Sequence, residues 1–112
     1  IRQADMSNFK PIIVITTLPN QASAELIGVL LLEKKLAACV QYENIVSQYM
    51  WEEKMCRDNE VRLSIKTSRH LYKETQKQIV QHHPYECPQV LMLPVSKGFA
   101  PYLRWFKRVL SA

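Results

Sequence analysis

Residues 60–67 carry the pattern that constrains the fold most strongly. Apolar and polar side chains alternate along this segment, in the order Val61, Arg62, Leu63, Ser64, Ile65 and Lys66. This period of two predicts a β-strand that buries one face and exposes the other. Such a strand needs neighbouring strands and a covering layer, so we expect a sheet with helices packed on one side.

The remaining segments supply that sheet and that layer. Strands are predicted at 11–17, 37–45, 47–54, 60–67 and 90–95, and helices at 21–36, 69–83 and 99–110. Asn20 and Ser68 precede the first two helices as N-caps, and 57–59 is the predicted turn between the third and fourth strands. If 37–45 and 47–54 form one long bent strand, the order becomes β-α-β-β-α-β with an extra C-terminal helix. This order predicts an α+β fold of the ferredoxin-like, split-βαβ type.

The helices carry apolar stripes that should face the sheet. In the first helix the stripe consists of Ala24, Ile27, Gly28 and Leu31, and in the second of Leu71, Thr75, Ile79 and His82. Gly28 costs about 1 kcal/mol in helix propensity. We therefore expect it to admit the close approach of a strand.

The chain of 112 residues is long enough for one domain, which we assign to residues 6–112. Met6 has the character of a native start, so residues 1–5 are interpreted as a leader outside the domain. The wholly apolar runs, such as 29–32, are far too short to cross a membrane. We therefore expect a cytoplasmic protein that does not act at a membrane.

The net charge of +5 is concentrated near the C-terminus. Residues 87–112 hold four basic side chains and no acidic one: Lys97, Arg104, Lys107 and Arg108. A nucleic-acid surface is one interpretation of this cluster. The pattern favours the solvated face of an amphipathic helix instead, because no aromatic residue is interleaved on that face. We expect no nucleic-acid partner.

The three cysteines form no CxxC pair, which favours free thiols and excludes a structural zinc site of the usual kind. Cys39 lies in an apolar run and is predicted to be buried, whereas Cys56 lies among charges and is predicted to be exposed. Cys39 and His83 could be drawn as a nucleophile and its base. No Gly-rich elbow or phosphate-binding loop accompanies them, so the chain is not expected to be an enzyme.

Residues 82–88 form the richest cluster of chemical groups, with two imidazoles, a phenol, a carboxylate and a thiol. His83, Glu86 and Cys87 lie between a helix end and a strand start, where a loop could aim them into one cleft. Imidazole and thiolate favour copper and zinc, so a divalent metal site is one interpretation, without any organic cofactor. Ordinary loop hydrogen bonds are the other, and composition alone favours it.

The predicted hairpin around Trp51 is long and has a charged tip. A chain this small has limited capacity to bury apolar surface within itself. The hairpin is therefore expected to pair with another copy of the chain. The other residues of interest are interpreted as core or interface anchors: Lys66, Tyr85, Tyr102 and Trp105.

Six segments in series resemble the CutA divalent-ion tolerance family. They are 14–19 (Val-Ile-Thr-Thr-Leu-Pro), 36–40 (Leu-Ala-Ala-Cys-Val), 47–54 (Ser-Gln-Tyr-Met-Trp-Glu-Glu-Lys), 63–67 (Leu-Ser-Ile-Lys-Thr), 83–88 (His-Pro-Tyr-Glu-Cys-Pro) and 102–105 (Tyr-Leu-Arg-Trp). The resemblance implies a ferredoxin-like subunit in a homotrimer, a cytoplasmic location and binding of copper or other divalent cations. A similarity to the nitrogen-regulatory signalling trimers implies an alternative, a small-ligand-binding module with clefts between subunits.

The resemblance also implies roles for particular residues. His83 is the best ligand candidate, and the positions that match the family's intersubunit cleft are Trp51, Lys66, Tyr85, Glu86, Tyr102 and Trp105. Thr16 stands where some bacterial members have a Cys that is a proposed copper ligand. Glu53 stands where the family usually has Gly, and Cys87 could restore a thiol near His83.

Overall fold

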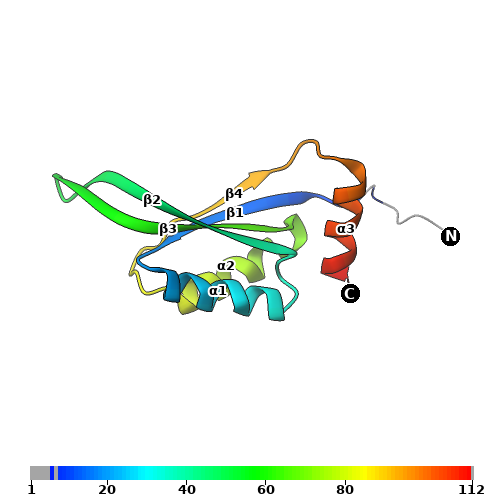
Figure 1. The fold of residues 1–112 in the computed structure, drawn as a ribbon, viewed down its shortest axis with the longest axis horizontal. Coiled ribbons are helices and arrows are strands. Elements are labelled where there is room, and N and C mark those ends of the chain that lie inside the picture. Colours follow the sequence, from blue (N-terminus) through cyan, green and yellow to red (C-terminus); the bar gives the residue numbers. More distant parts are fainter. Residues whose placement is uncertain (1–5, 7, 112) are drawn as a thin grey trace.

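The computed structural model describes residues 6 and 8–111, and the leader assigned to 1–5 lies outside them. The elements follow in the order β1 (Pro11–Leu18), α1 (Gln21–Glu33), β2 (Cys39–Trp51), β3 (Lys54–Ser68), the 3₁₀ turn Arg69–Leu71, α2 (Tyr72–His82), β4 (Val90–Pro94) and α3 (Ala100–Ser111). The predicted β-α-β-β-α-β order with an extra C-terminal helix is therefore confirmed (Figure 1).

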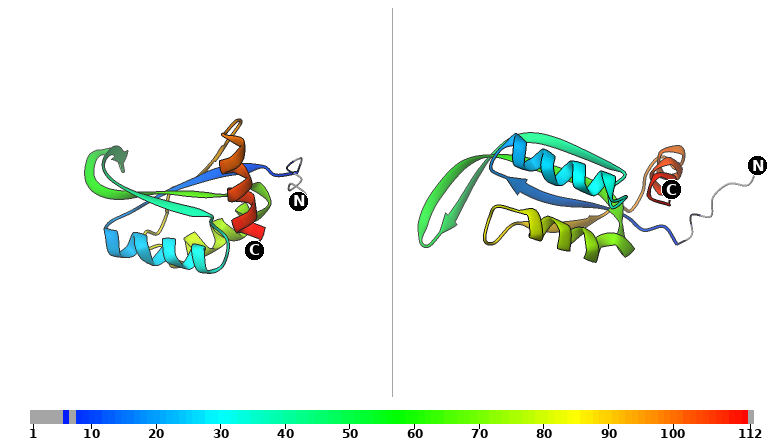
Figure 2. Two further views of the ribbon diagram at one scale, coloured as in Figure 1. Left: turned by 45° about the vertical axis from the view of Figure 1, so that its right-hand side comes forward. Right: turned by 90° about the horizontal axis from the view of Figure 1, so that it is seen from below.

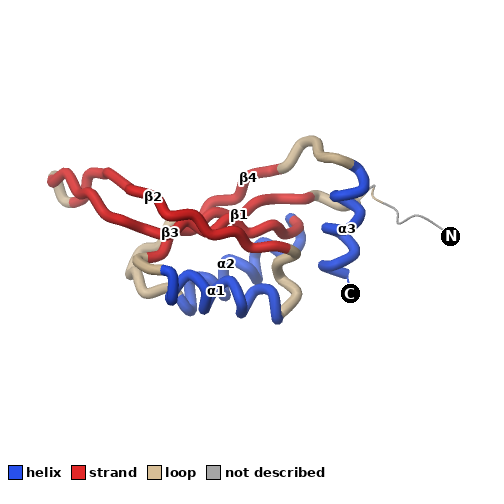
Figure 3. The backbone as a smooth tube through the Cα atoms, in the orientation of Figure 1, coloured by secondary structure: helices blue, strands red, loops and turns tan. Residues whose placement is uncertain are grey.

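The strands form one antiparallel sheet in the order β2-β3-β1-β4, the strand order of a split-βαβ fold. Helices α1 and α2 lie side by side across one face of the sheet (Figure 2), while α3 stands at one end of it. The β2–β3 hairpin extends past the helices at the other end, which gives the molecule extents of 57 × 25 × 22 Å (Figure 3). None of the described helices is long and apolar enough to cross a membrane.

The core lies between the sheet and the two helices. The predicted alternation of β3 is confirmed, since Val61, Leu63 and Ile65 are buried and the residues between them are half-buried. They pack with the buried side chains of the other elements: Ile12, Val14, Leu18, Ala24, Ile27, Leu31, Leu36, Ala37 and Ile79. Burial of this apolar surface is the main force that holds the helices on the sheet.

Helix α1 begins where its sequence predicts. The Asn20 side chain accepts a hydrogen bond from the backbone N–H of Ser23 at 2.8 Å, which satisfies one free donor of the first turn. The predicted stripe of Ala24, Ile27, Gly28 and Leu31 is buried. The close approach at Gly28 is also confirmed, because a Cβ atom there would lie 2.1 Å from the hydroxyl of Tyr42 on β2.

The turn of the hairpin is the main correction to the sequence analysis. It lies at Glu52 and Glu53, both with positive φ (48° and 66°), and not at 57–59. Positive φ at both central residues matches the twist of the flanking strands, as in type I′ turns. Residues 57–59 pair with 46–48, and β2 runs unbroken, so cross-strand pairing outweighs the turn preference of Arg57-Asp58-Asn59.

Several finer predictions are also wrong. Ser68 precedes a 3₁₀ turn, and its hydroxyl bonds Nδ1 of His70 at 2.7 Å instead of capping a helix. His82 is exposed rather than part of the buried stripe. Cys39 and Cys56 are both half-buried, because one opens β2 and the other lies in the hairpin.

Candidate functional site

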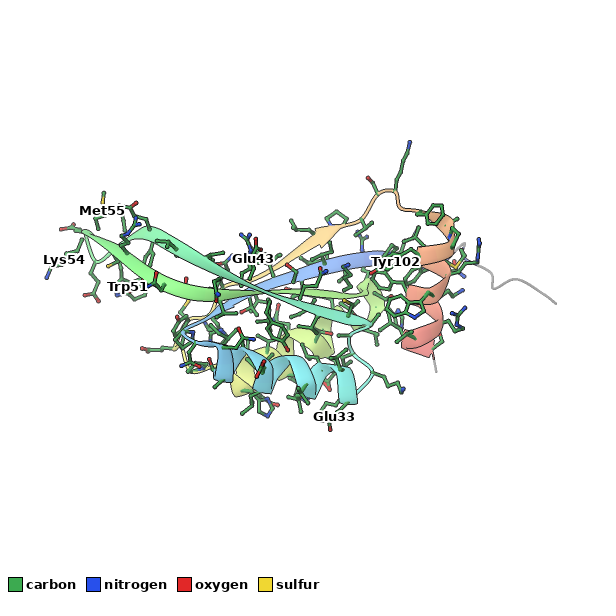
Figure 4. The ribbon with its side chains drawn as sticks, in the orientation of Figure 1. Glu33, Glu43, Trp51, Lys54, Met55 and Tyr102 are labelled. Atoms are coloured by element: carbon green, nitrogen blue, oxygen red, sulfur yellow. The ribbon has the colours of Figure 1, made fainter. Side chains whose placement is uncertain are left out.

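A hollow of about 1270 Å³ lies between the β2–β3 hairpin and the loop that precedes β4. The hairpin contributes residues of both its strands, and the loop contributes Pro84 through Cys87 and Gln89. Trp51 marks the outer end of the hollow near the hairpin tip (Figure 4). Its lining residues are Thr17, Ser47, Gln48, Tyr49, Trp51, Glu52, Cys56, Asp58, Glu60, Pro84, Tyr85, Glu86, Cys87 and Gln89.

The lining of this hollow is acidic. Four carboxylates border it: Glu52, Asp58, Glu60 and Glu86. No lysine or arginine is among the described residues that line it. A concave surface with charges of one sign raises the local concentration of the opposite ion. The hollow is therefore suited to cations, although the chain as a whole carries +5.

Two phenols hold two of these carboxylates in place. The Tyr85 hydroxyl donates to Oε2 of Glu60 at 2.7 Å, and the Tyr49 hydroxyl donates to Oδ2 of Asp58. The hydrogen bond to Asp58 raises the pKa of Tyr49 to about 12. Burial and then Glu60 raise the pKa of Tyr85 as well. Both phenols therefore stay protonated at neutral pH and remain donors.

His83 ties the loop before β4 to the end of β1 through two hydrogen bonds. Its Nε2–H donates to the backbone carbonyl of Thr17 at 2.9 Å, and its Nδ1 accepts from the backbone N–H of Tyr85 at 3.1 Å. These two bonds require the neutral ring with the proton on Nε2. Burial lowers the pKa of His83, against the opposing effect of the Thr17 carbonyl. Both ring nitrogens are thus engaged in positioning the loop.

The three donors predicted for a metal lie in one loop but do not converge in a single chain. Glu86 and Cys87 line the hollow, whereas His83 is turned toward the end of β1. Within residues 6 and 8–111, no group of three or more His, Cys, Asp or Glu side chains is arranged to hold a metal ion. Thr16 is fully buried in the core.

The predicted cleft residues form two groups in one chain. Trp51, Tyr85 and Glu86 line the hollow. Lys66 of β3 and Tyr102 and Trp105 of α3 lie together at the other end of the sheet, where Figure 4 labels Tyr102. The Lys66 Nζ donates to the Tyr102 hydroxyl at 3.0 Å. The same Nζ lies 5.2 Å from the centre of the Tyr102 ring. The centre of the Trp105 ring lies 5.5 Å from the centre of the Tyr102 ring.

Cys39 belongs to this second end of the sheet. It lies opposite Lys66 in the pairing of β2 with β3. It is therefore separated from His83, with which the sequence analysis considered a nucleophile and base pair. Both ring nitrogens of His83 instead form hydrogen bonds with backbone groups.

Sequence reasoning missed the hairpin residues that line the hollow, above all Tyr49, Asp58 and Glu60. The strand pairing contains the signal that could have found them, because Tyr49 lies opposite Cys56 and Ser47 lies opposite Asp58. Alternate residues of paired strands share a face. With the turn placed at 57–59 instead of 52–53, these residues could not be assigned to one face.

Comparison with known proteins gives one consistent family. The sequence pattern of the family described as CutA1 divalent ion tolerance protein matches residues 12–109. The divalent-cation tolerance protein CutA of Yersinia pestis (strain Pestoides F) is 40% identical over 95 residues, which cover 84% of this chain and 80% of that protein.

Solved structures agree with the sequence match. CutA1 from Oryza sativa superposes with a TM-score of 0.87 at 34% identity and covers 91% of this chain and 94% of its own. The periplasmic divalent cation tolerance protein CutA from Archaeoglobus fulgidus superposes with a TM-score of 0.87 at 31% identity. The match covers 89% of this chain and 98% of that chain. The chain belongs to the CutA1 divalent ion tolerance protein family.

Proposed function

We propose that this protein is a non-enzymatic, cytoplasmic divalent-cation tolerance protein that binds copper or another divalent cation as a homotrimer. The observation that carries the proposal is the acidic hollow between the hairpin and the loop before β4. Its four carboxylates attract cations, and its exposed loop offers Glu86 and Cys87 as ligands. Carboxylate and thiolate together suit borderline and softer ions such as zinc and copper.

The separation of the two cleft groups supports an assembly of several copies. The hollow and the Lys66–Tyr102–Trp105 group occupy opposite ends of one elongated chain, so a cleft that contains both needs two chains. Contacts that join one end of a subunit to the other end of its neighbour are heterologous, and such contacts form a ring when the rotation between neighbours closes. A ring of three copies contains three such clefts.

The uncovered face of the sheet also favours assembly. Helices α1 and α2 cover only the opposite face. On the uncovered face, Ile13 lies opposite Leu93 and Ile15 opposite Leu91, and the two leucines are about half exposed (50% and 53%). Contiguous apolar surface of this kind typically marks a contact with another protein. A second copy of the chain is the occupant that the family assignment favours.

His83 takes part in the proposed site through the loop. To bind an ion at Nδ1, the ring must first release the backbone N–H of Tyr85. The side chains of Glu86 and Cys87 have no such hydrogen bond to break among the described residues, so they are the first ligands that we propose. A complete coordination shell then takes further donors from a neighbouring copy, because the described donors of one chain do not converge.

The test measures oligomer mass and metal binding on the same protein. Light scattering should give three times the chain mass of 13.1 kDa. Calorimetry with Cu²⁺ and Zn²⁺ should give an affinity that a Glu86→Gln, Cys87→Ser double variant lowers by about tenfold or more. Glu33→Gln, an exposed carboxylate on α1 far from the hollow, is the matched control and should change nothing. A monomer, or equal affinities in both variants, contradicts the proposal.

A second candidate function rests on the Lys66 ammonium. It is fixed by the Tyr102 hydroxyl and ring, as a cation placed to receive a small anionic ligand would be. Such a fixed cation fits a small-ligand-binding signalling trimer with clefts between its subunits. Thermal shift with a panel of small anions separates the candidates, because a true ligand raises Tm by mass action. Stabilisation that Lys66→Met abolishes favours this second function.

A further inference from the structure

A second cavity, of about 420 Å³, lies on the side of the sheet that faces the helices. It forms where β2 and β3 extend past the start of α1 (Figure 1). Its apolar lining includes Pro19, Val46 and Val61. Since Val61 belongs to the core between the sheet and the helices, the cavity continues that side of the sheet. Its volume is typical of a ligand pocket.

Two asparagines and two valines form the strand side of this cavity. Asn44 lies opposite Val61 in the pairing of β2 with β3, and Val46 lies opposite Asn59. Alternate residues of a strand share a face, so the four side chains form one square patch. The carboxamides occupy one diagonal of the patch and the valines occupy the other. Val46 is 50% exposed and offers apolar contact beside the carboxamides.

The strand carboxamides are available to a ligand. Asn20 and Gln21 also line the cavity, but their side chains serve α1, where one accepts from Ser23 and the other donates to Glu25. Asn44 and Asn59 are both exposed, and their carboxamides form no hydrogen bond with any residue that the structure describes. Each therefore retains its donors and its acceptor.

The cavity directs no charge at its contents. Glu60 is the one acidic or basic residue among the described residues that line it. Its carboxylate accepts from the Tyr85 hydroxyl at 2.7 Å in the hollow, on the other side of the hairpin. An uncharged ligand with hydrogen-bonding groups is therefore the chemistry that this lining matches.

The spacing of the two carboxamides matches an extended peptide. Diagonal neighbours across an antiparallel pair lie about 7–8 Å apart, and their Cβ atoms lie somewhat closer. An extended chain rises about 3.2–3.4 Å per residue, so its alternate peptide groups are about 6.4–6.8 Å apart. A carboxamide can pair with both the N–H and the C=O of one peptide group.

We propose that this cavity binds an extended, uncharged peptide segment of a partner protein. Asn44 and Asn59 pair with alternate peptide groups of that segment, and the valines contact its side chains. The assembly proposed above uses the opposite face of the sheet, so it leaves this cavity open. The inference goes beyond the divalent-cation function and does not depend on the hollow.

The test follows the asparagine side chains directly. Protein labelled with ¹⁵N only at asparagine carboxamides gives one NH₂ group for each of Asn8, Asn20, Asn44 and Asn59. The probe is acetyl-Val-Ser-Val-methylamide, whose β-branched residues favour the extended form. We expect the signals of Asn44 and Asn59 to shift together and to saturate, while that of Asn8, outside the cavity, stays unchanged. Shifts that do not saturate, or that are no larger than at Asn8, would overturn the proposal.

A second probe separates a peptide from a small amide. Acetamide, supplied at the same concentration of amide groups, carries the same chemistry without the spacing. It should bind at least about tenfold more weakly, because two linked contacts reinforce each other. Equal affinity for acetamide overturns the assignment of the cavity to a peptide.

A double variant tests the two carboxamides. Asn44→Leu with Asn59→Leu keeps the side chains similar in size but removes their hydrogen-bonding groups, so the affinity for the peptide should fall by about tenfold or more. Asn8→Leu is the matched control and should retain the wild-type affinity. The peptide methylated at every backbone nitrogen tests the same bonds on the unaltered protein and should lose affinity by a similar factor. Unchanged affinity in either experiment overturns the site, whatever happens to oligomer mass or to metal binding at the hollow.

Discussion

Replacing Gly28 with alanine tests how β2 packs on α1. A Cβ atom at this position would lie 2.1 Å from the Tyr42 hydroxyl oxygen, 3.0 Å from Cζ of the same ring and 3.2 Å from Cγ1 of Val40. Favourable contact between such atoms begins at about 3.5 Å, so the ring must move by roughly 1 Å or more. Tyr42 is half-buried, packed against the core, and cannot move without losing contacts there.

The two contributions to the expected effect oppose each other. Alanine favours a helix interior by about 1 kcal/mol over glycine. Overpacking of a well-packed site costs about 1–3 kcal/mol. Because three atoms are too close, we expect the cost to exceed the gain, and Gly28→Ala to lower the free energy of unfolding by up to about 2 kcal/mol. A loss of about 1 kcal/mol lowers Tm by roughly 5 °C in a domain of this size.

A double-mutant cycle identifies the cause. Tyr42→Phe removes the hydroxyl that makes the shortest contact, so Gly28→Ala in that background should recover at least about half of its cost. Urea unfolding at one fixed protein concentration measures each variant, since assembly makes stability concentration-dependent. The matched control is Gly98→Ala, whose Cβ would meet only the flexible end of Leu103 at 3.0 Å. A stabilised Gly28→Ala, or the same cost with Phe at 42, would refute the reasoning.

Three further predictions concern stability. Thr16 and Thr67 bury hydroxyls that have no hydrogen-bond partner among the described residues, so changing either to Val should raise the free energy of unfolding by about 1 kcal/mol, measured in urea. Glu53→Gly should stabilise by about 1 kcal/mol, since glycine adopts the observed φ of 66° without strain; a loss of stability would argue against that turn. Burial lowers the pKa of His83 in the folded state, so the unfolded chain binds more protons. Stability should therefore fall as pH drops below about 6.5, the ordinary histidine value, and His83→Asn should reduce this dependence.

The sequence predicts the sheet well where burial dictates the pattern. The alternation at 60–67 identified the inner half of β3, because one face of that segment packs on helices. Gly28 indicated a close approach, and the structure adds the partner, Tyr42. Helix propensity can flag such a glycine, but it cannot say which side chain occupies the space. That information depends on the register between α1 and β2, which no local pattern encodes.

The hairpin tip shows the opposite case. Arg57-Asp58-Asn59 has the composition of a turn, whereas Glu52-Glu53 lacks the glycine or asparagine that usually permits positive φ. Local preference therefore pointed to the wrong place. Thirteen residues of β2 pair with β3 in one continuous register, and the sum of these pairs outweighs the strain at two glutamates. Because the turn was misplaced, the carboxylates of Asp58 and Glu60 were not assigned to the candidate site.

The distribution of charge connects the fold to the proposed function. The net charge of +5 would repel metal ions from an evenly charged sphere. The fold instead puts four carboxylates around one hollow at the hairpin end and places Arg104, Lys107 and Arg108 on α3 at the other end. Screening at physiological salt confines each field to about 8 Å. Since the molecule is 57 Å long, a cation at the hollow experiences the local carboxylates and not the basic helix of its own chain. Cation binding at the hollow and a basic net charge are therefore compatible within one chain.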